Sequence, residues 1–433
     1  MIIDFTIENF RSIKEKQTFS LTAGSGKKHS ANFFENENYS NLKLLKTSVI
    51  YGANASGKTN IIRALHAFRY LILFSSDLKP GDNIKCYDPF LFDDTLANGP
   101  TSFSLRFIGT DNIKYEYSIS FNNEEILFEE LKYYPKDYPA TLFTRQNIGE
   151  VKIGKNFDNK KNVPKQVLKN RLFLSEVGGN SYHEHMNSIY LFFKDKIQVW
   201  NLTESFNIHH LERRITQLLS EDQNSNLLKR MSDLIRVADL KVEKISITNR
   251  RDLDAKVFEG IPEELKEDII EQYKYKVETV HNYRNKAGDI VTKKIDLNDE
   301  SHGTKVLYAL GGLILEKFQS GGVIIFDELE NSLHPILCRF LISLFHNEKI
   351  NIKNTQLIFT THQTELLGER LFRKDQIWLT NKIKFGETEF YSLADFDNVR
   401  DDVPLDKWYM SGKFEGLPKI TPLKGPLFSE YRK

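Results

Sequence analysis

The sequence predicts an α/β fold, in which a mixed sheet carries a glycine-rich loop and is joined by an antiparallel β subdomain and a helical insertion. Three observations support this prediction. A short apolar strand that ends in glycine leads directly into a helix over residues 44–74. Alternating apolar and polar residues with turns between them indicate a β meander over 102–132. Residues 163–237 have mostly helical spacing of apolar residues, which indicates the helical segment.

The N-terminal elements follow from the same spacing. Residues 1–10 alternate as in a half-buried strand, and residues 16–23 indicate a second one. The polar, Asn-rich stretch 24–43 is expected to form a loop. The apolar run 44–52 is typical of a buried strand, and residues 58–74 have apolar positions three or four apart, as in a helix.

The C-terminal half alternates between strands and helices. Strands are expected at 242–248 and 274–284. The later elements are, in chain order, a helix at 306–318, a very apolar strand at 321–328, a helix at 336–348, and strands at 355–363, 375–382 and 388–396. The last segment, 400–433, holds several Pro and Gly residues and is expected to be irregular.

The bulk composition narrows the class of protein. The 433 residues correspond to about two to three domains. Lys and Arg number 60 against 59 Asp and Glu, which disfavours a protein built mainly to coat nucleic acid or a membrane, though it leaves room for a local basic patch. Cys86 and Cys338 lie too far apart to indicate a disulfide scaffold or a structural zinc site. We see no signal peptide and no membrane-spanning run, and therefore expect a cytoplasmic protein.

The stretch GANASGKT, Gly52 to Thr59, matches in full the pattern G-x-x-x-x-G-K-[ST] of the phosphate-binding loop (P-loop). Its glycines let backbone N–H groups surround phosphates, and the helix N-terminus adds positive partial charge. Lys58 is expected to reach the terminal phosphates of a nucleotide, and the Thr59 hydroxyl to ligate Mg²⁺. The alternative is that the pattern matches by chance. This is disfavoured because the stretch follows an apolar strand and opens a helix, as the motif requires.

A second glycine-lysine stretch, AGSGKK, lies at residues 23–28. It fails the pattern because Leu21 stands where the first glycine belongs and Lys28 replaces the Ser or Thr. We therefore expect a surface loop there.

The run VIIFDE supplies the other half of a nucleotide site. Residues 323–326 are expected to form a central parallel strand that is buried on both faces. Asp327 at its end is expected to hold Mg²⁺, directly or through water, and Glu328 to polarise the attacking water. Two acids after a strand are otherwise a plain edge turn, but the P-loop upstream favours the nucleotide site.

His362 ends a third strand, LIFTTHQ. A histidine at this position can hydrogen-bond the γ-phosphate or the attacking water. A lone histidine is more often structural, but the chain order of P-loop, acid pair and strand-histidine favours the functional interpretation. The catalytic residues expected from these motifs are Lys58, Asp327, Glu328 and His362.

Stretches spread over nearly the whole chain resemble the ABC-type ATPase heads of SMC, RecF and OLD proteins. The closest resemblance is to the AAA-family ATPases called family fifteen, found in bacterial anti-phage defence loci. The stretches that carry it are ENFRSIKEKQTFSL, YGANASGKTNIIRAL, ESHGTK, FDELENSLHP, TTHQTELL, YSLADFDNVRDD and YMSGKFEGLP.

The resemblance implies an ABC-type head that binds ATP and Mg²⁺. Its expected parts are a first ATPase lobe with P-loop and meander at 1–160, a helical insertion at 161–237, a second lobe with the signature motif, acid pair and histidine at 238–400, and a tail at 401–433.

The resemblance also implies binding residues. Arg11 resembles an arginine that approaches bound nucleotide. Ser301 and Gly303 match the serine and second glycine of the ABC signature, which in the family contacts the γ-phosphate bound to the opposite subunit. Gln146 and Gln166 are candidates for the Q-loop glutamine, but neither has supporting context. The residues expected to surround the phosphates are Gly52, Asn54, Ala55, Ser56, Gly57, Lys58, Thr59 and Asn60.

Three functions follow. The first is an ATPase switch that dimerises its heads around ATP, forms a homodimer or higher oligomer, and controls a separately encoded effector, a nuclease or toxin, in anti-phage defence. The second is a DNA-repair ATPase that binds nucleic acid directly, as RecF does. The third, a small-molecule kinase, would have no signature motif.

Two local interpretations stay open. Ser301 is either an ordinary helix N-cap or part of a site for the ATP of a second subunit, and both can hold together. The histidine-containing stretches 183–185 and 209–210 are expected to be polar helical surface rather than metal ligands, because neighbouring residues on a helix point in different directions.

Overall fold

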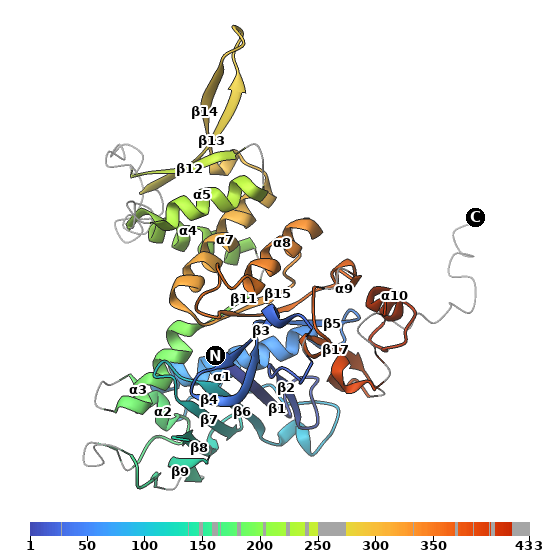
Figure 1. The fold of residues 1–433 in the computed structure, drawn as a ribbon. Helices are drawn as coiled ribbons and strands as arrows, with labels where there is room; N and C mark the ends of the chain where they lie inside the picture. Colours follow the sequence, from blue (N-terminus) through green and yellow to red (C-terminus); the bar gives the residue numbers. More distant parts are fainter. Residues whose placement is uncertain are drawn as a thin grey trace, which may run out of the picture.

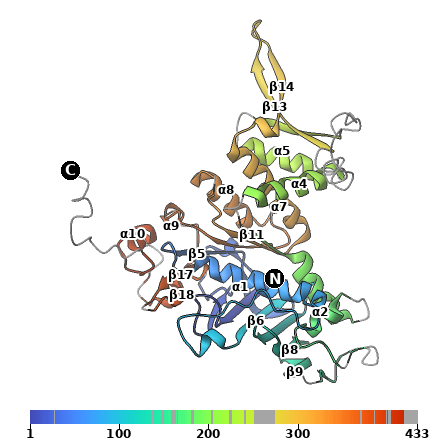
Figure 2. The same ribbon diagram turned by 180° about the vertical axis from the view of Figure 1, so that it is seen from behind.

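The body of the molecule consists of two sheets with helices between and outside them, and a second lobe carries a projecting β-hairpin (Figure 1). Figure 2 shows the same two lobes and the hairpin from behind. The computed structural model describes the chain apart from residues 27, 137, 147–149, 158–162, 165, 180–182, 202–204, 222–225, 239–241, 250–273, 332, 369–370, 384, 398, 400–402 and 418–433.

The first sheet is antiparallel and contains the meander. On its strands, side chains alternate between core and surface, as the period of two requires. The strands, in spatial order, are β10 (Lys152–Ile153), β9 (Ala140–Gln146), β8 (Ile126–Tyr134), β7 (Lys114–Phe121), β6 (Thr101–Ile108), β1 (Ile2–Glu8) and β2 (Gln17–Ser20).

The second sheet is mixed. Its strands, in spatial order, are β11 (Ile197–Asn201), β15 (Val323–Asp327), β16 (Gln356–Thr360), β5 (Thr47–Gly52), β17 (Ile377–Lys382) and β18 (Thr388–Ser392). The first five run parallel, and β18 is antiparallel to β17. The carboxyl ends of the parallel strands therefore meet at one edge, where open α/β sheets bind ligands.

Both faces of the mixed sheet are buried. One face of β5, β15 and β16, with Ile50, Ile325 and Ile358, joins the core shared with α1 (Lys58–Phe74) and the antiparallel sheet. The other face packs in the core that contains α7 (His302–Ser320) and α8 (Pro335–His346). This double burial explains why these strands are continuous apolar runs rather than alternating ones.

The second lobe packs on α7. The helices α4 (Ser205–Glu221) and α5 (Asn226–Ala238) lie against it, followed by the three-stranded sheet of β12 (Val242–Asn249), β13 (Tyr275–Arg284) and β14 (Ile290–Asp296). A Cβ on Gly311 would lie 2.6 Å from Leu234, and one on Gly312 2.2 Å from Ile215. The glycine pair in the middle of α7 thus permits the close approach of α4 and α5.

Smaller elements complete the fold. They are β3 (Phe33–Asn36), β4 (Tyr39–Leu45), α2 (Phe173–Gly178), α3 (Glu184–Leu191), a π-helical turn (Phe192–Lys196), α9 (Glu365–Gly368) and α10 (Leu405–Met410). Short 3₁₀ turns lie at Ser30–Asn32, Ser75–Asp77, Leu96–Asn98, Leu297–Asp299, Lys374–Gln376 and Leu393–Asp395. Among the described residues, no helix has the length and apolarity needed to span a membrane.

The predicted α/β class, with its mixed sheet, antiparallel subdomain and helical segment, is confirmed. Several local expectations are wrong or incomplete. The segment 400–433, expected to be irregular, contains the helix α10. The stretch 24–43, predicted as a loop, holds β3 and most of β4, whose apolar residues were obscured by the asparagines of their connecting turn. The segment predicted as helical contains β11, which pairs with β15 at the edge of the mixed sheet. The strand β14 was not predicted at all, because its sequence is largely polar and exposed.

Candidate functional site

The predicted P-loop connects β5 to α1. Gly52 has φ +157° and Gly57 has φ +107°, a left-handed value that favours glycine. A Cβ on Gly57 would lie 2.2 Å from Thr388 Oγ1, and one on Gly52 2.1 Å from Thr380 Oγ1. The two glycines are therefore required by the backbone conformation and by the side chains of β17 and β18 packed beneath the loop.

Lys58 is buried and folds back onto its own loop. Its ammonium donates hydrogen bonds to the carbonyl oxygens of Gly52, at 2.9 Å, and Ala53, at 3.1 Å. Burial lowers the pKa of Lys58, and the nearby carboxylates of Glu328, Asp327 and Glu330 partly offset this. Lys58 is thus close to the acids at and after the end of β15, which lie about 270 positions downstream in the sequence.

Asp327 links the P-loop to two strand ends. Its Oδ1 accepts hydrogen bonds from the hydroxyls of Thr59, at 3.2 Å, and Thr360, at 2.7 Å. The aspartate is buried at the end of β15, and Thr360 ends the neighbouring strand β16. Hydroxyl and carboxylate oxygens are the ligands that Mg²⁺ takes in proteins, so the donor set of Thr59 and Asp327 fits this ion.

Glu328 adopts a backbone conformation that is unusual for its residue type. Its φ is +56°, in the left-handed region, and its N–H donates to Thr360 Oγ1 at 2.7 Å. A non-glycine residue in this region costs on the order of 1 kcal/mol or more and tends to occur at functional sites. The half-buried Glu328 carboxylate is close enough to Lys58 to affect its pKa.

His362 lies beyond the end of β16, and its ring is exposed at the rim of the site. Its backbone N–H donates to Glu330 Oε1, which joins the segment after β16 to the segment after β15. The pKa of His362 is lowered, first by partial desolvation and then by the Lys58 ammonium. The ring is therefore neutral at pH 7, where it can donate one hydrogen bond and accept another.

The loop that carries Arg11 lies beside the P-loop. The neighbouring Ser12 hydroxyl accepts from Asn60 Nδ2 at 2.6 Å and hydrogen-bonds Thr388 Oγ1 at 2.7 Å. Arg11 itself has φ +54° and pairs with Asp88 at 2.6 Å. The structure thus brings Asn60 and the Arg11 loop together, while the Arg11 guanidinium is directed to an aspartate.

The outer P-loop residues differ in exposure. Asn54 and Ala55 are exposed, and Ala55 has φ +62°. Ser56 is buried, its hydroxyl 2.5 Å from Thr380 Oγ1, and its carbonyl accepts from Thr388 Oγ1 at 2.8 Å. These threonines on β17 and β18 were not predicted, since isolated threonines in strands give no sequence signal.

Ser301 and Gly303 lie on the second lobe, at the start of α7. Ser301 is exposed and caps this helix, with its hydroxyl accepting from the Thr304 N–H at 3.1 Å. Among the described residues, the hydrogen bonds of the Ser301 side chain go to Thr304 alone. The N-cap interpretation is confirmed, and these two residues are not part of the cluster around Lys58.

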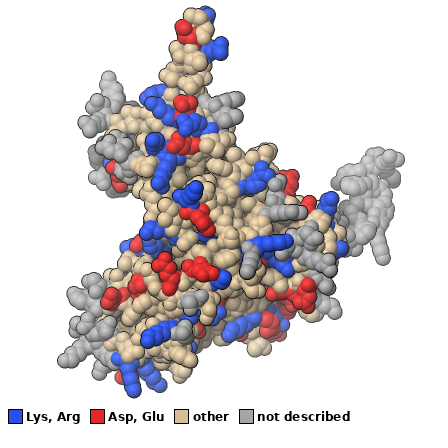
Figure 3. Space-filling model, in the orientation of Figure 1, with Lys and Arg blue, Asp and Glu red and all other residues tan. Residues whose placement is uncertain are grey.

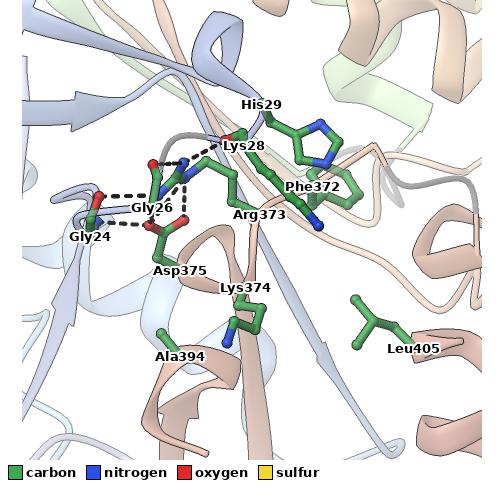
Figure 4. Close-up of a pocket in the computed structure, with 10 residues that line it drawn as sticks. All are labelled: Gly24, Gly26, Lys28, His29, Phe372, Arg373, Lys374, Asp375, Ala394 and Leu405. Atoms are coloured by element: carbon green, nitrogen blue, oxygen red, sulfur yellow. Dashed lines mark hydrogen bonds and ion pairs between the residues drawn. The ribbon is translucent and has the colours of Figure 1, made fainter. Parts of the chain in front are cut away.

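The described residues of the AGSGKK stretch, 23–26 and 28, lie in a surface loop that has its own structural role. Arg373, which is buried, donates to the carbonyls of Gly24, Gly26 and Lys28 at 2.6 to 3.1 Å and pairs with Asp375 (Figure 4). The residues around Arg373 line a cavity of about 310 Å³. Three carbonyls of the loop therefore face the Arg373 guanidinium, whereas a phosphate site requires backbone N–H groups.

The histidine stretches are only partly surface. His183 is buried and the His185 ring nitrogen Nδ1 is 2.6 Å from the Tyr115 hydroxyl, so the expectation of polar surface is wrong for this stretch. His209 and His210 are exposed on α4, as expected. Within the described part of the chain, no three His, Cys, Asp or Glu residues gather as a metal-binding group.

A match to a known protein family adds to this geometry. A family model described as "AAA domain, putative AbiEii toxin, Type IV TA system" matches residues 48–368, from β5 to α9. This range includes the P-loop, the acid pair and His362, and covers well over half of the chain. The chain belongs to this family. It is therefore an ATPase-type protein of the AAA class.

Other comparisons add less. A search of the curated proteins finds no match. Among solved structures, the chain is similar to the recombination mediator protein RecF with ATP, at 12% identity and a TM-score of 0.36, over 90% of this chain and 97% of that one. A second RecF structure, described with ATPrS, has 12% identity and a TM-score of 0.34, over 90% of this chain and 98% of that one. The family assignment rests on the family model alone.

Proposed function

We propose that this AAA-family protein is an ABC-type ATPase that closes two heads around ATP and thereby switches a separate effector. The observation that carries the proposal is the convergence on Asp327 of the Thr59 and Thr360 hydroxyls. It joins the P-loop and the ends of two neighbouring parallel strands, which is where a nucleotide and its metal are bound in sheets of this kind.

The residues have separate roles in this proposal. The P-loop backbone and the N-terminus of α1 bind the phosphates, with Asn54, Ala55, Ser56, Gly57 and Asn60 around them. Thr59 and Asp327 would hold Mg²⁺, which supplies neutralisation of charge on the phosphate oxygens. Lys58 leaves the Gly52 and Ala53 carbonyls and turns to the terminal phosphates. The buried ammonium of Lys58 thereby gains an anionic partner, the terminal phosphates.

Water attack requires a base and an orienting group. Glu328 accepts the proton of the attacking water, and its left-handed backbone fixes the direction of the carboxylate. His362, neutral at pH 7, donates a hydrogen bond to the γ-phosphate or orients the water. Glu330 holds the His362 backbone in place.

The signature residues complete the site from a second copy. Ser301 and Gly303 open a helix of 19 residues, whose exposed N-terminus favours an anion. The P-loop helix already serves the nucleotide of the same chain, so the N-terminus of α7 is free to serve the γ-phosphate held by a partner head. Arg11 leaves its ion pair with Asp88 and contacts the nucleotide instead. The product is a homodimer that exists only with ATP between the heads.

The effector is a second protein. The family description, "putative AbiEii toxin, Type IV TA system", links the family to a toxin–antitoxin pair, which supports a toxin as the separately encoded partner. The switch then operates in the cytoplasm during anti-phage defence. Binding of ATP selects the closed heads, and hydrolysis releases them, so the effector responds to the state of the heads.

The substitution Glu328→Gln tests the proposal. It keeps the shape of the side chain and removes the base, so ATP should stay bound and the closed dimer should accumulate. Size-exclusion chromatography with light scattering measures the dimer, and retained radiolabelled ATP measures the trapped nucleotide. Lys58→Ala is the matched control and should give neither. A Glu328→Gln protein that stays monomeric and retains no more ATP than wild type would contradict the proposed dimer with ATP between its heads.

A second candidate function has its own observation. Direct binding of nucleic acid, as in a repair ATPase, is supported by a concentration of Lys and Arg on the β13–β14 hairpin, although the whole chain carries a net charge of only +1.

A further inference from the structure

The β13–β14 hairpin stands away from the rest of the molecule. Strand β12 pairs with β13 only from Tyr275 to His281, so residues 282–292 form a ribbon of two strands and a turn without a third strand (Figures 1 and 2). The ribbon projects from the end of the second lobe in both views. The ribbon is therefore exposed to any molecule that approaches the second lobe.

The tip of the hairpin is a built turn. Asn285 Oδ1 accepts from the backbone N–H groups of Ala287 and Asp289, each at 2.9 Å, and Gly288 takes the left-handed φ of +89°. The Asn285 amide also donates to the Asp289 carboxylate at 3.2 Å. These hydrogen bonds stabilise the turn that joins the two strands.

The exposed charges on the hairpin are mostly positive. Arg284, Lys286 and Lys293 are exposed, and within the described part of the chain none of the three makes an ion pair. Nearer the base, Glu278 is shared by Lys276, at 2.8 Å, and Lys294, at 3.0 Å. Figure 3 shows Lys and Arg at the tip, beside an acidic side chain, and again among acidic side chains where the hairpin meets the lobe.

Apolar side chains lie among these cations. Tyr283 is 49% exposed and Ile290 is 70% exposed, and both are in the ribbon beyond β12. Exposed aromatic and cationic side chains together fit a nucleic acid, whose phosphates take the cations and whose bases stack on aromatic rings. A two-stranded ribbon is also narrow enough to enter the major groove of DNA.

The base of the hairpin is tied to the residue before Ser301. Glu300 Oε1 accepts from the Thr279 hydroxyl and from His281 Nε2, the latter at 2.7 Å, and both donors lie on β13. Strand β14 leads after Asp296 directly into the 3₁₀ turn that precedes Ser301, and Asp296 caps that turn. Both strands of the hairpin therefore hold the short segment that positions the α7 N-terminus.

We propose that the β13–β14 hairpin is a docking arm for nucleic acid, and that Glu300 transmits its occupation to Ser301. The docking half stands on the charge and shape of the hairpin. The transmission half rests on the proposed role of Ser301 at the nucleotide of a second subunit. A nucleic acid that moves the hairpin would shift the α7 N-terminus and so alter closure of the heads.

The docking half is tested without ATP by fluorescence anisotropy, with a labelled DNA duplex and the same sequence as single-stranded RNA. The test variant is Arg284→Glu, Lys286→Glu, Lys293→Glu. The matched control reverses three exposed lysines on the body of the molecule, Lys85→Glu, Lys152→Glu, Lys155→Glu, and so has the same net charge.

The expected result is a loss of affinity confined to the hairpin variant. Three phosphate contacts give a slope of log affinity against log salt of about −2.7, so wild-type affinity should fall by about 40-fold from 50 to 200 mM salt. The hairpin variant should bind at least tenfold more weakly, with a flatter slope, and the control within twofold of wild type. The docking arm would be overturned if wild type bound neither the DNA duplex nor the RNA at 50 mM salt. It would also be overturned if the control variant lost as much affinity as the hairpin variant. Loss of a co-purified protein partner with nucleic-acid binding unchanged would also overturn it, in favour of a protein surface.

The transmission half is tested by ATP turnover with and without the duplex. Duplex should change wild-type turnover at least threefold, and Glu300→Ala should remove this response while nucleic-acid affinity stays within twofold. Glu300→Gln keeps an acceptor for Thr279 and should restore at least half of the response. A full response in Glu300→Ala, or a wild type that hydrolyses ATP at the same rate with and without the duplex, would overturn the transmission. Absence of any turnover in wild type, with nucleic-acid binding intact, would instead count against the proposed ATPase and leave the docking arm standing.

Discussion

The Thr59 hydroxyl donates a hydrogen bond to Asp327 Oδ1 across 3.2 Å, although the two residues are 268 positions apart in the sequence. One ends the P-loop and the other ends β15. Strand β16 lies between β15 and β5, so the contact requires all three strands to finish at the same edge. The pair is the most direct geometric reason to treat the P-loop and the acid strand as one site.

Asp327→Asn should abolish magnesium-dependent stabilisation by ATP. The amide keeps an oxygen for Thr59 and Thr360, but the charge that favours the ion is removed. For the wild type, ATP with Mg²⁺ at 100 times the dissociation constant should add about 2.7 kcal/mol to the free energy of unfolding, and in the variant this gain should be near zero. Thermal unfolding with ATP, with and without Mg²⁺, measures it. Asp233→Asn, on the surface of α5, is the control, and an equal magnesium effect in both variants would contradict the role given to Asp327.

Gly57→Ala should destroy nucleotide binding while the fold is retained. The added Cβ would meet Thr388 Oγ1 at 2.2 Å and would impose a side chain on a residue with φ +107°. The control is Gly81→Ala, since Gly81 has φ +90° but open space around its Cβ position. Both variants should lose on the order of 1 kcal/mol from backbone strain, and Gly57→Ala should lose more because of the contact with Thr388. Only Gly57→Ala should also lose ATP affinity, by tenfold or more. Isothermal titration with ATP decides, and normal affinity in Gly57→Ala would show that the P-loop tolerates the side chain.

Much of the site was predictable because its motifs are local. The strand, P-loop and helix from Leu44 to Phe74 are continuous in sequence, and so are the apolar run and the acids at Asp327 and Glu328. Each pattern carries its own physical requirement, such as glycine for backbone approach or an acid at a strand end. The structure places Lys58 among these acids, which the sequence suggested only through their order.

The parts that escaped prediction depend on contacts between distant strands. Thr380 and Thr388 support the P-loop from β17 and β18, and Glu330 holds the segment of His362. Isolated threonines in strands have no pattern of their own. Strand β11 escaped because five residues between helices are too few to establish a period. The Arg11–Asp88 pair likewise joins two loops whose proximity follows only from the fold.

Ser301→Arg should prevent hydrolysis without preventing ATP binding. The serine caps α7 away from the Lys58 cluster, so an arginine there leaves the P-loop of the same chain intact, but it fills the surface proposed to meet a second head. ATP turnover should fall by at least a hundredfold, and the affinity of the monomer for ATP should stay within threefold of wild type. Ser320→Arg makes the same change at the other end of the same helix and should keep turnover. Loss of ATP affinity in Ser301→Arg would mean that the stretch supports the fold and not a partner head.

The stability of the protein should fall with acid through His346, far from the nucleotide. Its ring nitrogen Nε2 is 2.8 Å from Thr47 Oγ1, at the start of β5. Burial, and then the Lys46 ammonium and His29, lower the pKa of His346 to about 3. The native state therefore keeps the ring neutral while the unfolded chain takes up a proton below its ordinary pKa of about 6.5. The contribution is complete above that pH and is lost progressively as the pH falls toward 3.

The difference between the pKa of His346 in the folded and in the unfolded protein sets the size of this effect. Between pH 6.5 and pH 5 the free energy of unfolding should decrease by about 2 kcal/mol from this group, at about 1.4 kcal/mol per pH unit. His346→Gln cannot take up the proton, so its urea-unfolding midpoint should depend less on pH over that range. His302→Gln, on the exposed start of α7, should keep the wild-type dependence. Parallel curves for wild type and His346→Gln would show that this buried ring does not govern the acid response, and the acid sensitivity would then have to come from other buried groups.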